Sequence, residues 1–268
     1  MKLDILDNSK NKTGEINLPS QFEEDFRPDL IHRAVLTLQS HKRQPYAASP
    51  DAGKRSSAKL SRRRRKYRGS YGIGISRVPR KILTRRGARM NWVGAFAPGT
   101  VGGRRAHPPK AEKIWWQKIN EKERIKALRS AISATVIKDI VAQRGHLTPL
   151  DYPFILDDKF ESLGKTKEVV KALENLGFGK ELERVQKKKV RAGKGKSRGR
   201  KYQKKKGPLI VVSNTSKLME AASNIPGIDI VLVKNINAEL LAPGAKPGRL
   251  TLWTSAAINM MDKEKLFK

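Results

Sequence analysis

The most chemically distinctive stretch of this 268-residue chain is a run of arginines and lysines that surrounds tyrosines. The string SRRRRKYRGS, at residues 61–70, places five arginines and one lysine around Tyr67, and Tyr71 follows it. Arginine binds phosphate in a bidentate manner and stacks on bases, while tyrosine rings offer flat faces on which bases stack. These residue types at this spacing therefore indicate a partner that is rich in phosphate and in aromatic rings.

The positive charge is concentrated in two internal segments. The whole chain has a net charge of +33, from 58 Lys and Arg against 25 Asp and Glu. Residues 43–110 hold 19 of the bases and one acid, Asp51, while residues 187–206 hold 12 bases and no acid. Because like charges at this density repel one another, we expect both segments to become ordered against a polyanion. The remaining 180 residues, with 27 bases and 24 acids, are nearly neutral.

The sequence favours folded RNA as this polyanion. A membrane-surface segment would be an amphipathic helix, and the glycines and prolines of residues 43–110 interrupt any such helix. There is no helix-turn-helix or zinc-finger pattern, and basic arms with little regular structure suit a crevice in RNA. The chain has no apolar run of about 18 residues, no signal-peptide layout and no cysteine. We therefore expect a cytoplasmic RNA-binding protein without membrane contact.

None of the sequence patterns typical of enzymes is complete in this chain. GIGISR, at residues 72–77, lacks the third glycine of a dinucleotide-binding loop, and GKGKS, at residues 193–197, lacks the first glycine of a phosphate-binding loop. The four histidines have no metal-ligand spacing. Asp157 and Asp158 have the chemistry to bind a cation, but a turn after a strand explains them better. We predict that the chain is not an enzyme and has no metal site, and no cofactor beyond structural Mg²⁺ of the RNA.

The nearly neutral part of the chain alternates between strand and helix patterns. In chain order we expect a hairpin within residues 1–18, helices from Pro28 and from Asn120 to Gly145, a strand at 153–156, helices at 167–176 and 178–185, a strand at 209–213, a helix to Asn224, strands at 229–233 and 250–253, a helical turn at 237–241 and a closing helix at 254–267. Asn120 and Glu123 predict a capping pair.

Continuous apolar strands that alternate with helices are typical of an α/β domain whose mostly parallel sheet is covered on both faces. We therefore expect a three-layer α/β body formed by residues 1–42 and 111–268. A long extended loop at 43–110 would project from this body, and 187–206 would form a second basic loop within it.

Six strings follow one another along the chain in an order that chance does not explain. They are FRPDLIHRAV at 26–35, RVPR at 77–80, GGRRAHPPK at 102–110, RSAISAT at 129–135, RGRKYQKKKGP at 198–208 and LLAPGAKPGRLTLWT at 240–254. With these strings the chain resembles, over its full length, the universal L-four family of large-subunit ribosomal proteins in its archaeal form. The resemblance implies a structural constituent of the large subunit that binds large-subunit rRNA, supports assembly and lines the polypeptide exit tunnel with a loop tip.

Carried onto this sequence, the resemblance places the tip at about residues 75–97 and the two limbs at the arginine-rich run and residues 102–110. The implied RNA-binding residues are Arg62, Arg63, Arg64, Arg65, Lys66, Tyr67, Arg68, Arg104, Arg105, His107, Lys110, Lys196, Arg198, Arg200, Lys201 and Tyr202. The candidate tunnel-lining residues are Arg77, Val78, Arg80, Arg85, Arg86, Arg89, Met90 and Trp92. Met90 and Trp92 either face the tunnel or are wedged against bases.

The implied partners are large-subunit rRNA and neighbouring ribosomal proteins, including one of the L-twenty-two type, and no homo-oligomer is expected. An alternative is a free RNA-binding regulator or chaperone that uses the same basic segments on transient partners. An enzyme that acts on RNA is a more distant alternative.

Overall fold

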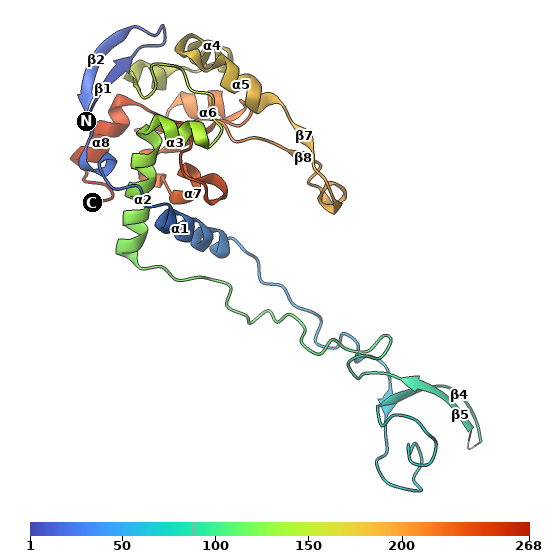
Figure 1. The fold of residues 1–268 in the computed structure, drawn as a ribbon. Helices are drawn as coiled ribbons and strands as arrows, with labels where there is room; N and C mark the ends of the chain where they lie inside the picture. The colour runs from blue at the N-terminus through green and yellow to red at the C-terminus, as the bar shows by residue number, and fades with distance from the viewer. Residues whose placement is uncertain (88) are drawn as a thin grey trace. The chain divides into compact units, whose positions relative to one another are not determined.

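The computed structural model describes residues 1–87 and 89–268, and it divides the chain into two compact units (Figure 1). The body comprises Met1–Lys42 and Trp116–Lys268, and the arm comprises Arg43–Trp115. The sequence predicts an arm that ends at residue 110, whereas this unit ends at Trp115. Residue 88, which belongs to the predicted tip, lies outside the described residues.

The first sheet of the body contains a hairpin and one parallel neighbour. β1 (Lys2–Leu6) pairs antiparallel with β2 (Lys12–Asn17). On its other side, β1 pairs parallel with the two-residue strand β6 (Ile155–Leu156). The hairpin predicted within residues 1–18 is confirmed.

The second sheet of the body is parallel throughout. Its central strand, β9 (Leu209–Val212), lies between β10 (Asp229–Leu232) and β11 (Thr251–Trp253). A single parallel bridge between Leu156 and Thr254 joins β6 to the end of β11.

The prediction of an α/β protein is confirmed, but that of a three-layer body on one mostly parallel sheet is not. The described strands form small sheets in which antiparallel and parallel pairs are mixed. Apolar runs identify buried strands, yet they do not specify which neighbour each strand takes. A short turn such as the one after β1 forces its two strands to be antiparallel.

Eight α-helices are found in the described part of the body. In chain order they are α1 (Pro28–His41), α2 (Glu121–Val136), α3 (Lys138–Gln143), α4 (Thr166–Leu173), α5 (Gly179–Gln186), α6 (Lys217–Ser223), α7 (Ala238–Leu241) and α8 (Ser255–Lys263). Short 3-10 turns lie at Ser20–Phe22, Asp158–Ser162, Lys194–Arg198, Val233–Asn235 and Pro243–Ala245, and a π turn lies at Glu174–Phe178. No helix in residues 1–87 and 89–268 is both long and apolar enough to cross a membrane.

The helix predicted from Asn120 to Gly145 is two helices. Ile137 has extended backbone, with φ −83° and ψ 104°, and it separates α2 from α3. Val136 and Ile137 are consecutive β-branched residues with low helix propensity, which favours a break at this point. The predicted capping pair is wrong, because the side chain of Asn120 makes no capping hydrogen bond to the start of α2.

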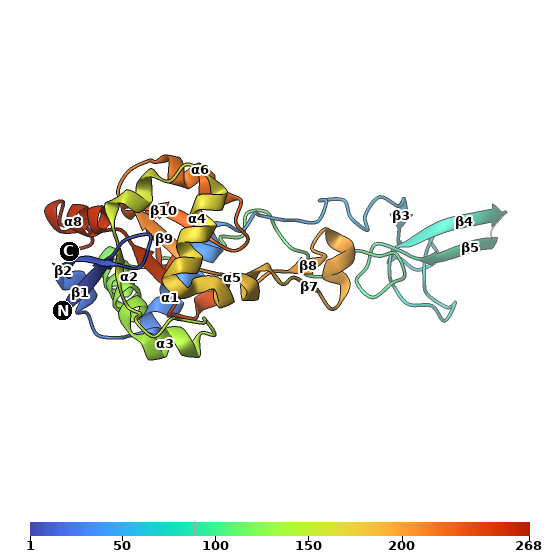
Figure 2. The same ribbon diagram turned by 90° about the horizontal axis from the view of Figure 1, so that it is seen from above.

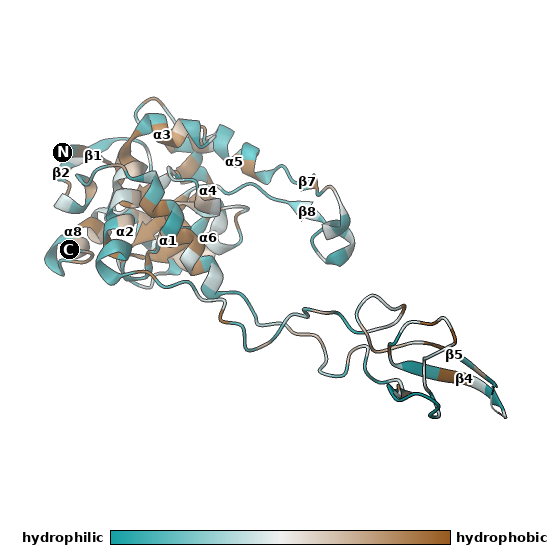
Figure 3. Ribbon diagram, turned by 60° about the horizontal axis from the view of Figure 1, so that its bottom comes forward, coloured by the Kyte–Doolittle hydropathy of each residue, from teal (hydrophilic) through white to brown (hydrophobic). Residues whose placement is uncertain are grey.

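β9 supplies side chains to both hydrophobic clusters of the body. Leu209 and Val211 belong to a cluster with α1, α2, α7 and α8, while Ile210 and Val212 belong to a cluster with α4 and α6. This division follows from the alternation of side chains along a strand. All four residues are fully buried, and each contributes about 1.5–3 kcal/mol through burial. Figure 3 shows the apolar residues gathered among the helices of the body.

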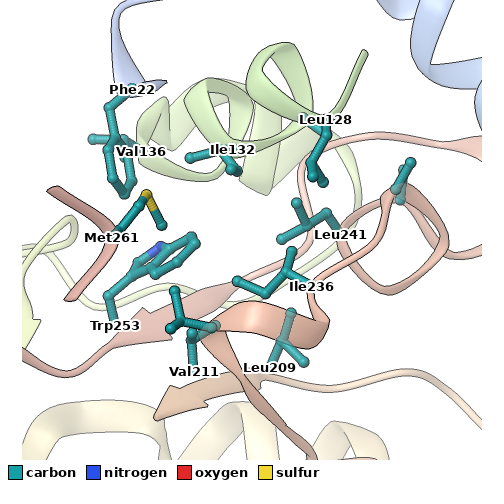
Figure 4. Packing of buried hydrophobic residues seen from close by; sticks show 14 of the residues in the cluster. Phe22, Leu128, Ile132, Val136, Leu209, Val211, Ile236, Leu241, Trp253 and Met261 are labelled. Carbon is teal, nitrogen blue, oxygen red and sulfur yellow. The ribbon is translucent and has the colours of Figure 1, made fainter. Parts of the chain in front are cut away.

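An aromatic pair closes one end of the first cluster (Figure 4). The rings of Phe22 and Trp253 meet edge to face, with centroids 5.1 Å apart, and Met261 lies beside them. The indole nitrogen of Trp253 donates to the hydroxyl of Thr135 at 3.4 Å, so its polar atom is satisfied inside the core.

The two chain segments that lead to the arm are hydrogen-bonded to each other within the body. The backbone N–H of Gln117 donates to Ser40 Oγ at 3.0 Å, and Gln117 O lies 3.0 Å from His41 Nε2. The end of α1 therefore lies next to the segment that precedes α2. Because both hydrophobic clusters consist of body residues, the arm adds nothing to either of them.

We expect the body to fold without the arm. When residues 43–115 are replaced by a short glycine-serine linker, the protein should retain a single cooperative thermal transition, because the joined ends are already adjacent. Circular dichroism melts of the two proteins provide the comparison, with a change in melting temperature of only a few degrees expected. A variant without a cooperative transition would contradict the division into body and arm.

Candidate nucleic-acid interface

The second basic loop is a short two-stranded ribbon that leaves the body after α5. β7 (Lys189–Val190) pairs antiparallel with β8 (Tyr202–Gln203), and the loop extends away from the body in both ribbon views (Figures 1 and 2). The 3-10 turn at its tip is stabilised by backbone contacts, since Arg200 N donates to Gly195 O at 3.1 Å. Arg191 also contacts the returning side of the loop, because its Nε donates to Arg200 O at 3.2 Å.

All five RNA-binding candidates of this loop are exposed. They are Lys196, Arg198, Arg200, Lys201 and Tyr202. The ring of Tyr202 has the ammonium groups of Lys188 and Lys201 at 4.7 and 5.5 Å from its centroid. The loop therefore presents an aromatic face among cations.

A buried ion-pair network fixes the start of the second loop. The carboxylate of Glu181 accepts two hydrogen bonds from Arg184, at 2.6 and 2.7 Å, and lies 2.7 Å from His146 Nδ1. It also accepts from the backbone N–H of Leu147 at 3.0 Å. Burial by itself raises the pKa of Glu181, but these hydrogen bonds outweigh burial and hold the pKa below its ordinary value. Arg184 also donates to Lys206 O at 2.8 Å, so the network holds both ends of the loop.

A second buried arginine holds the end of the loop. The side chain of Arg249 is 1% exposed; it donates to Gly207 O at 2.9 Å and to Asp229 Oδ2 at 2.6 Å. The ammonium of Lys206 reaches the same carboxylate oxygen at 2.9 Å. Burial raises the pKa of Asp229, but Arg249 and Lys206 hold it below its ordinary value.

Sequence reasoning does not identify this anchor. Glu181 and Arg184 stand three residues apart on α5, which is a recognisable helical pairing. By contrast, Asp229 and Arg249 are brought together only by β10 and the segment before β11, and no local pattern marks them. His146 is buried and lies within hydrogen-bonding distance of Glu181.

The arm contains a three-stranded antiparallel sheet. β4 (Arg80–Arg86) pairs with β3 (Ala58–Lys59) and with β5 (Arg89–Gly94). Arg86 and Arg89 lie directly opposite each other. The expectation of little regular structure in the arm is therefore wrong for these three strands.

The arginine-rich run lies against the β4–β5 hairpin. The guanidinium of Arg85, in β4, lies 5.0 Å from the ring centroid of Tyr67, and that of Arg68 lies 5.4 Å away. Tyr71 has Arg64 and Arg77 at 5.6 and 5.4 Å from its centroid. Both tyrosines remain substantially exposed, at 52% and 40%. The RNA-binding candidates Arg62, Arg63, Arg64, Arg65 and Lys66 are exposed, and Arg68 is half-buried.

The tunnel-lining candidates divide into exposed and half-buried side chains. Arg77, Arg85, Arg86 and Arg89 are exposed, whereas Val78, Arg80, Met90 and Trp92 are half-buried. Met90 and Trp92 share one face of β5 and line a cavity of about 860 Å³ together with Tyr67 and Ile73. Arg80 lies over the ring of Trp92, at 5.9 Å from its centroid.

The two limbs of the arm run side by side. Ala48 N donates to Pro109 O at 3.2 Å, and a Cβ atom at Gly53 would lie 2.5 Å from Arg104 Cα. Only glycine permits this close approach of two backbones. The candidates Arg105, His107 and Lys110 are exposed on the second limb, and Arg104 is half-buried.

The cations of the arm have no protein counter-ions in the described chain. Every ion pair found in residues 1–87 and 89–268 joins residues of the body, and none includes a lysine or arginine of 43–110. The arm is therefore an uncompensated cationic surface.

The acidic pair that we considered for cation binding has a structural role. The side chain of Asp157 accepts from Asp158 N at 2.8 Å. Asp158 accepts from Ala256 N at 2.7 Å and from the hydroxyl of Ser255 at the start of α8, whose N-cap residue is Thr254. Among the described residues there is no group of three histidines and carboxylates arranged to hold a metal ion.

The chain matches one protein family over most of its length. A family model described as the ribosomal protein L4/L1 family matches residues 16–264. The chain is 53% identical over 268 residues to "Large ribosomal subunit protein uL4" of Nanoarchaeum equitans, with all of both chains covered. Proteins of the same name from Archaeoglobus fulgidus and Methanococcoides burtonii are 45% and 46% identical, with 97% and 96% of this chain and 98% and 96% of theirs covered. The predicted resemblance to an archaeal family is confirmed.

The anchor of the second loop should make stability depend on pH. Because the folded-state pKa of Glu181 is lowered, the ionised carboxylate contributes to the free energy of unfolding at pH values above the ordinary carboxyl pKa of about 4.3. That contribution is lost as the pH falls through the folded-state value. Glu181→Gln should lower the free energy of unfolding by about 3 kcal/mol at neutral pH. The difference in free energy of unfolding between wild type and Glu181→Gln should become smaller under acidic conditions. Urea denaturation at several pH values measures both effects.

The matched control is Glu168→Gln, which removes an exposed carboxylate that lies 3.5 Å from Lys165. An exposed pair of this kind contributes less than about 1 kcal/mol, so the control should change stability little. A gap between wild type and Glu181→Gln that stayed constant at all pH values would contradict the assigned ion-pair network.

Proposed function

The chain belongs to the ribosomal protein L4/L1 family, and we propose that it is a structural constituent of the large ribosomal subunit that binds large-subunit rRNA and supports assembly. The family consists of ribosomal proteins, so the prediction that this chain is not an enzyme is confirmed by its relatives. The archaeal relatives carry the large ribosomal subunit in their names.

One observation carries the RNA-binding proposal: the excess positive charge of the chain lies on two segments that contain a single carboxylate between them, Asp51. Residues 43–110 carry 19 bases and one acid, and the described part of this segment forms no ion pairs. In the hairpin, Arg86 lies opposite Arg89, although like charges in opposite positions destabilise a sheet. Phosphate groups would relieve this repulsion, and bidentate arginine contacts suit them.

The aromatic residues of the two segments favour RNA over a generic polyanion. Tyr67, Tyr71 and Tyr202 each combine an exposed ring with cations near its face. Unpaired RNA bases stack on such rings while the neighbouring cations bind the phosphates. Base stacking is available in folded RNA with splayed bases but not in a uniform duplex or a lipid surface.

The tip at about residues 75–97 is proposed to line the polypeptide exit tunnel, together with a neighbouring protein of the L-twenty-two type. The family resemblance supports this role, and the exposed arginines Arg85, Arg86 and Arg89 at the end of the hairpin are suited to it. Met90 and Trp92 face the cavity beside Tyr67, a position that suits the alternative in which they contact bases.

The protein would act in the cytoplasm as part of the ribosome. It would need no cofactor of its own, and structural Mg²⁺ ions would be held by the RNA. A free RNA-binding regulator is the competing class. A structural constituent should sediment with large subunits at one copy per subunit through moderate salt, while a transient regulator should be substoichiometric.

The salt dependence of RNA binding tests the proposal. Replacing Arg62, Arg63 and Arg64 with glutamine removes three cations from the arm. Because each phosphate contact contributes about 0.7–0.9 to the slope of log affinity against log salt, the slope should decrease by roughly 2–3. Filter binding of large-subunit rRNA between about 0.05 and 0.3 M salt measures this slope.

A charge-matched control replaces Lys12, Arg27 and Lys165 with glutamine, three exposed cations that already pair with carboxylates of the body. The control loses the same charge and should keep the slope of the wild type. Equal slopes for the arm variant and the control would refute a role of the arginine-rich run in binding phosphate.

A further inference from the structure

The base of the arm holds an aromatic cluster that sequence reasoning did not single out. Tyr46, on the first limb, and Trp115, at the end of the second, stack with ring centroids 5.5 Å apart and an interplanar angle of 18°. The guanidinium of Arg43 lies 3.7 Å from the centroid of Trp115, and the ammonium of Lys113 lies 4.4 Å from it. Trp115 is therefore surrounded by three groups of the arm itself.

Tyr46 differs from Trp115 because part of its ring is free. Its side chain is half exposed although it stacks on Trp115, and Arg43 lies 5.6 Å from its centroid. The stack thus holds the Tyr46 ring in a fixed orientation, with surface left for a further planar group. Offset stacking of this kind is favourable for a third ring.

A cavity opens beside this stack. It has a volume of about 610 Å³, and its walls include Tyr46, Trp115, His107, Pro108 and Lys110. This volume lies within the range of roughly 300–1,000 Å³ that small-molecule sites occupy, which is ample for one nucleotide. The indole N–H of Trp115 is buried and has no hydrogen-bond partner within the described chain.

The charges around the cavity complement a nucleotide. Arg105, Lys110 and Lys113 line it, and one carboxylate, Glu112, stands among them. A flat aromatic surface bordered by cations has the chemistry to stack a base and bind its phosphate. A phosphate without a base would make no use of the aromatic stack, and a lipid surface would require an apolar face broader than one ring.

We propose that the Tyr46–Trp115 stack is a docking site for a single unpaired RNA base, with the adjoining phosphates bound by Arg105, Lys110 and Lys113. This inference rests on the proposed RNA-binding function and deepens it, since it assigns base stacking, in addition to phosphate binding, to the base of the arm. The site makes the protein prefer single-stranded RNA to a duplex at this position.

The test compares two RNA probes, a short single-stranded adenosine oligonucleotide and an RNA duplex of equal length, with the full-length protein. Tyr46→Leu removes the ring, and base stacking on an aromatic side chain changes affinity by roughly 5- to 150-fold per base. We expect this loss for the single strand at every salt concentration, with an unchanged salt slope and unchanged affinity for the duplex. Tyr46→Phe keeps the ring and should bind as the wild type does.

A phosphate contact gives a different signature at the same site. Arg105→Gln should weaken both probes and reduce the salt slope by about 0.7–0.9. If Tyr46→Leu weakened both probes equally, the stack would only hold the limbs together, and the proposal would be overturned. It would also be overturned if Tyr46→Leu bound the single strand as tightly as the wild type.

These outcomes are separable from a failure of the proposed function. If the wild-type protein bound neither RNA with a salt-dependent affinity, RNA binding itself would be refuted. If it bound both with a steep salt slope and Tyr46→Leu were unaffected, only the base-docking site would be lost. Circular dichroism of each variant checks that the body, which shares no core residue with Tyr46, is intact.

Discussion

Mutual repulsion among the cations of residues 43–110 and 187–206 constrains the whole molecule. These segments carry nearly all of the excess charge of the chain. Neither segment contributes to the two hydrophobic clusters, which are built on β9 and its covering helices. The body must therefore be stable by itself, and the basic segments are free to adapt their surfaces to an anionic partner.

Hydrogen bonds and ion pairs of the body lie close to the positions where each basic segment joins it. At the second loop, Glu181 and Asp229 accept hydrogen bonds from arginines that also hold backbone carbonyls of the loop end. At the start of the arm, the ammonium of Lys42 pairs with the carboxylate of Glu239, 2.5 Å away. These carboxylates therefore pair with cations at the positions where the segments join the body. The other cations of the two basic segments remain available to an anionic partner.

Within the basic segments, many cations contact aromatic rings, whereas cations of the body pair with carboxylates. Arginines lie over Tyr67, Tyr71 and Trp92, and lysines lie over Tyr202. Each exposed cation–π contact is worth about 0.5–1 kcal/mol, which is enough to orient a side chain but not to neutralise it. The result is a surface on which stacking and phosphate binding are available together. In the Tyr46–Trp115 stack, both limbs of the arm contribute a ring.

The sequence by itself determined where the charge lies, the hairpin at the N-terminus, the buried β9 and the family, because these follow from local composition, alternation and ordered motifs. Tertiary structure decided what depends on distant partners. The direction of strand pairing, the pairing of Asp229 with Arg249 and the stacking of Tyr46 on Trp115 are of this kind. Local patterns do not encode them, because each is fixed by packing between residues that are distant in the chain.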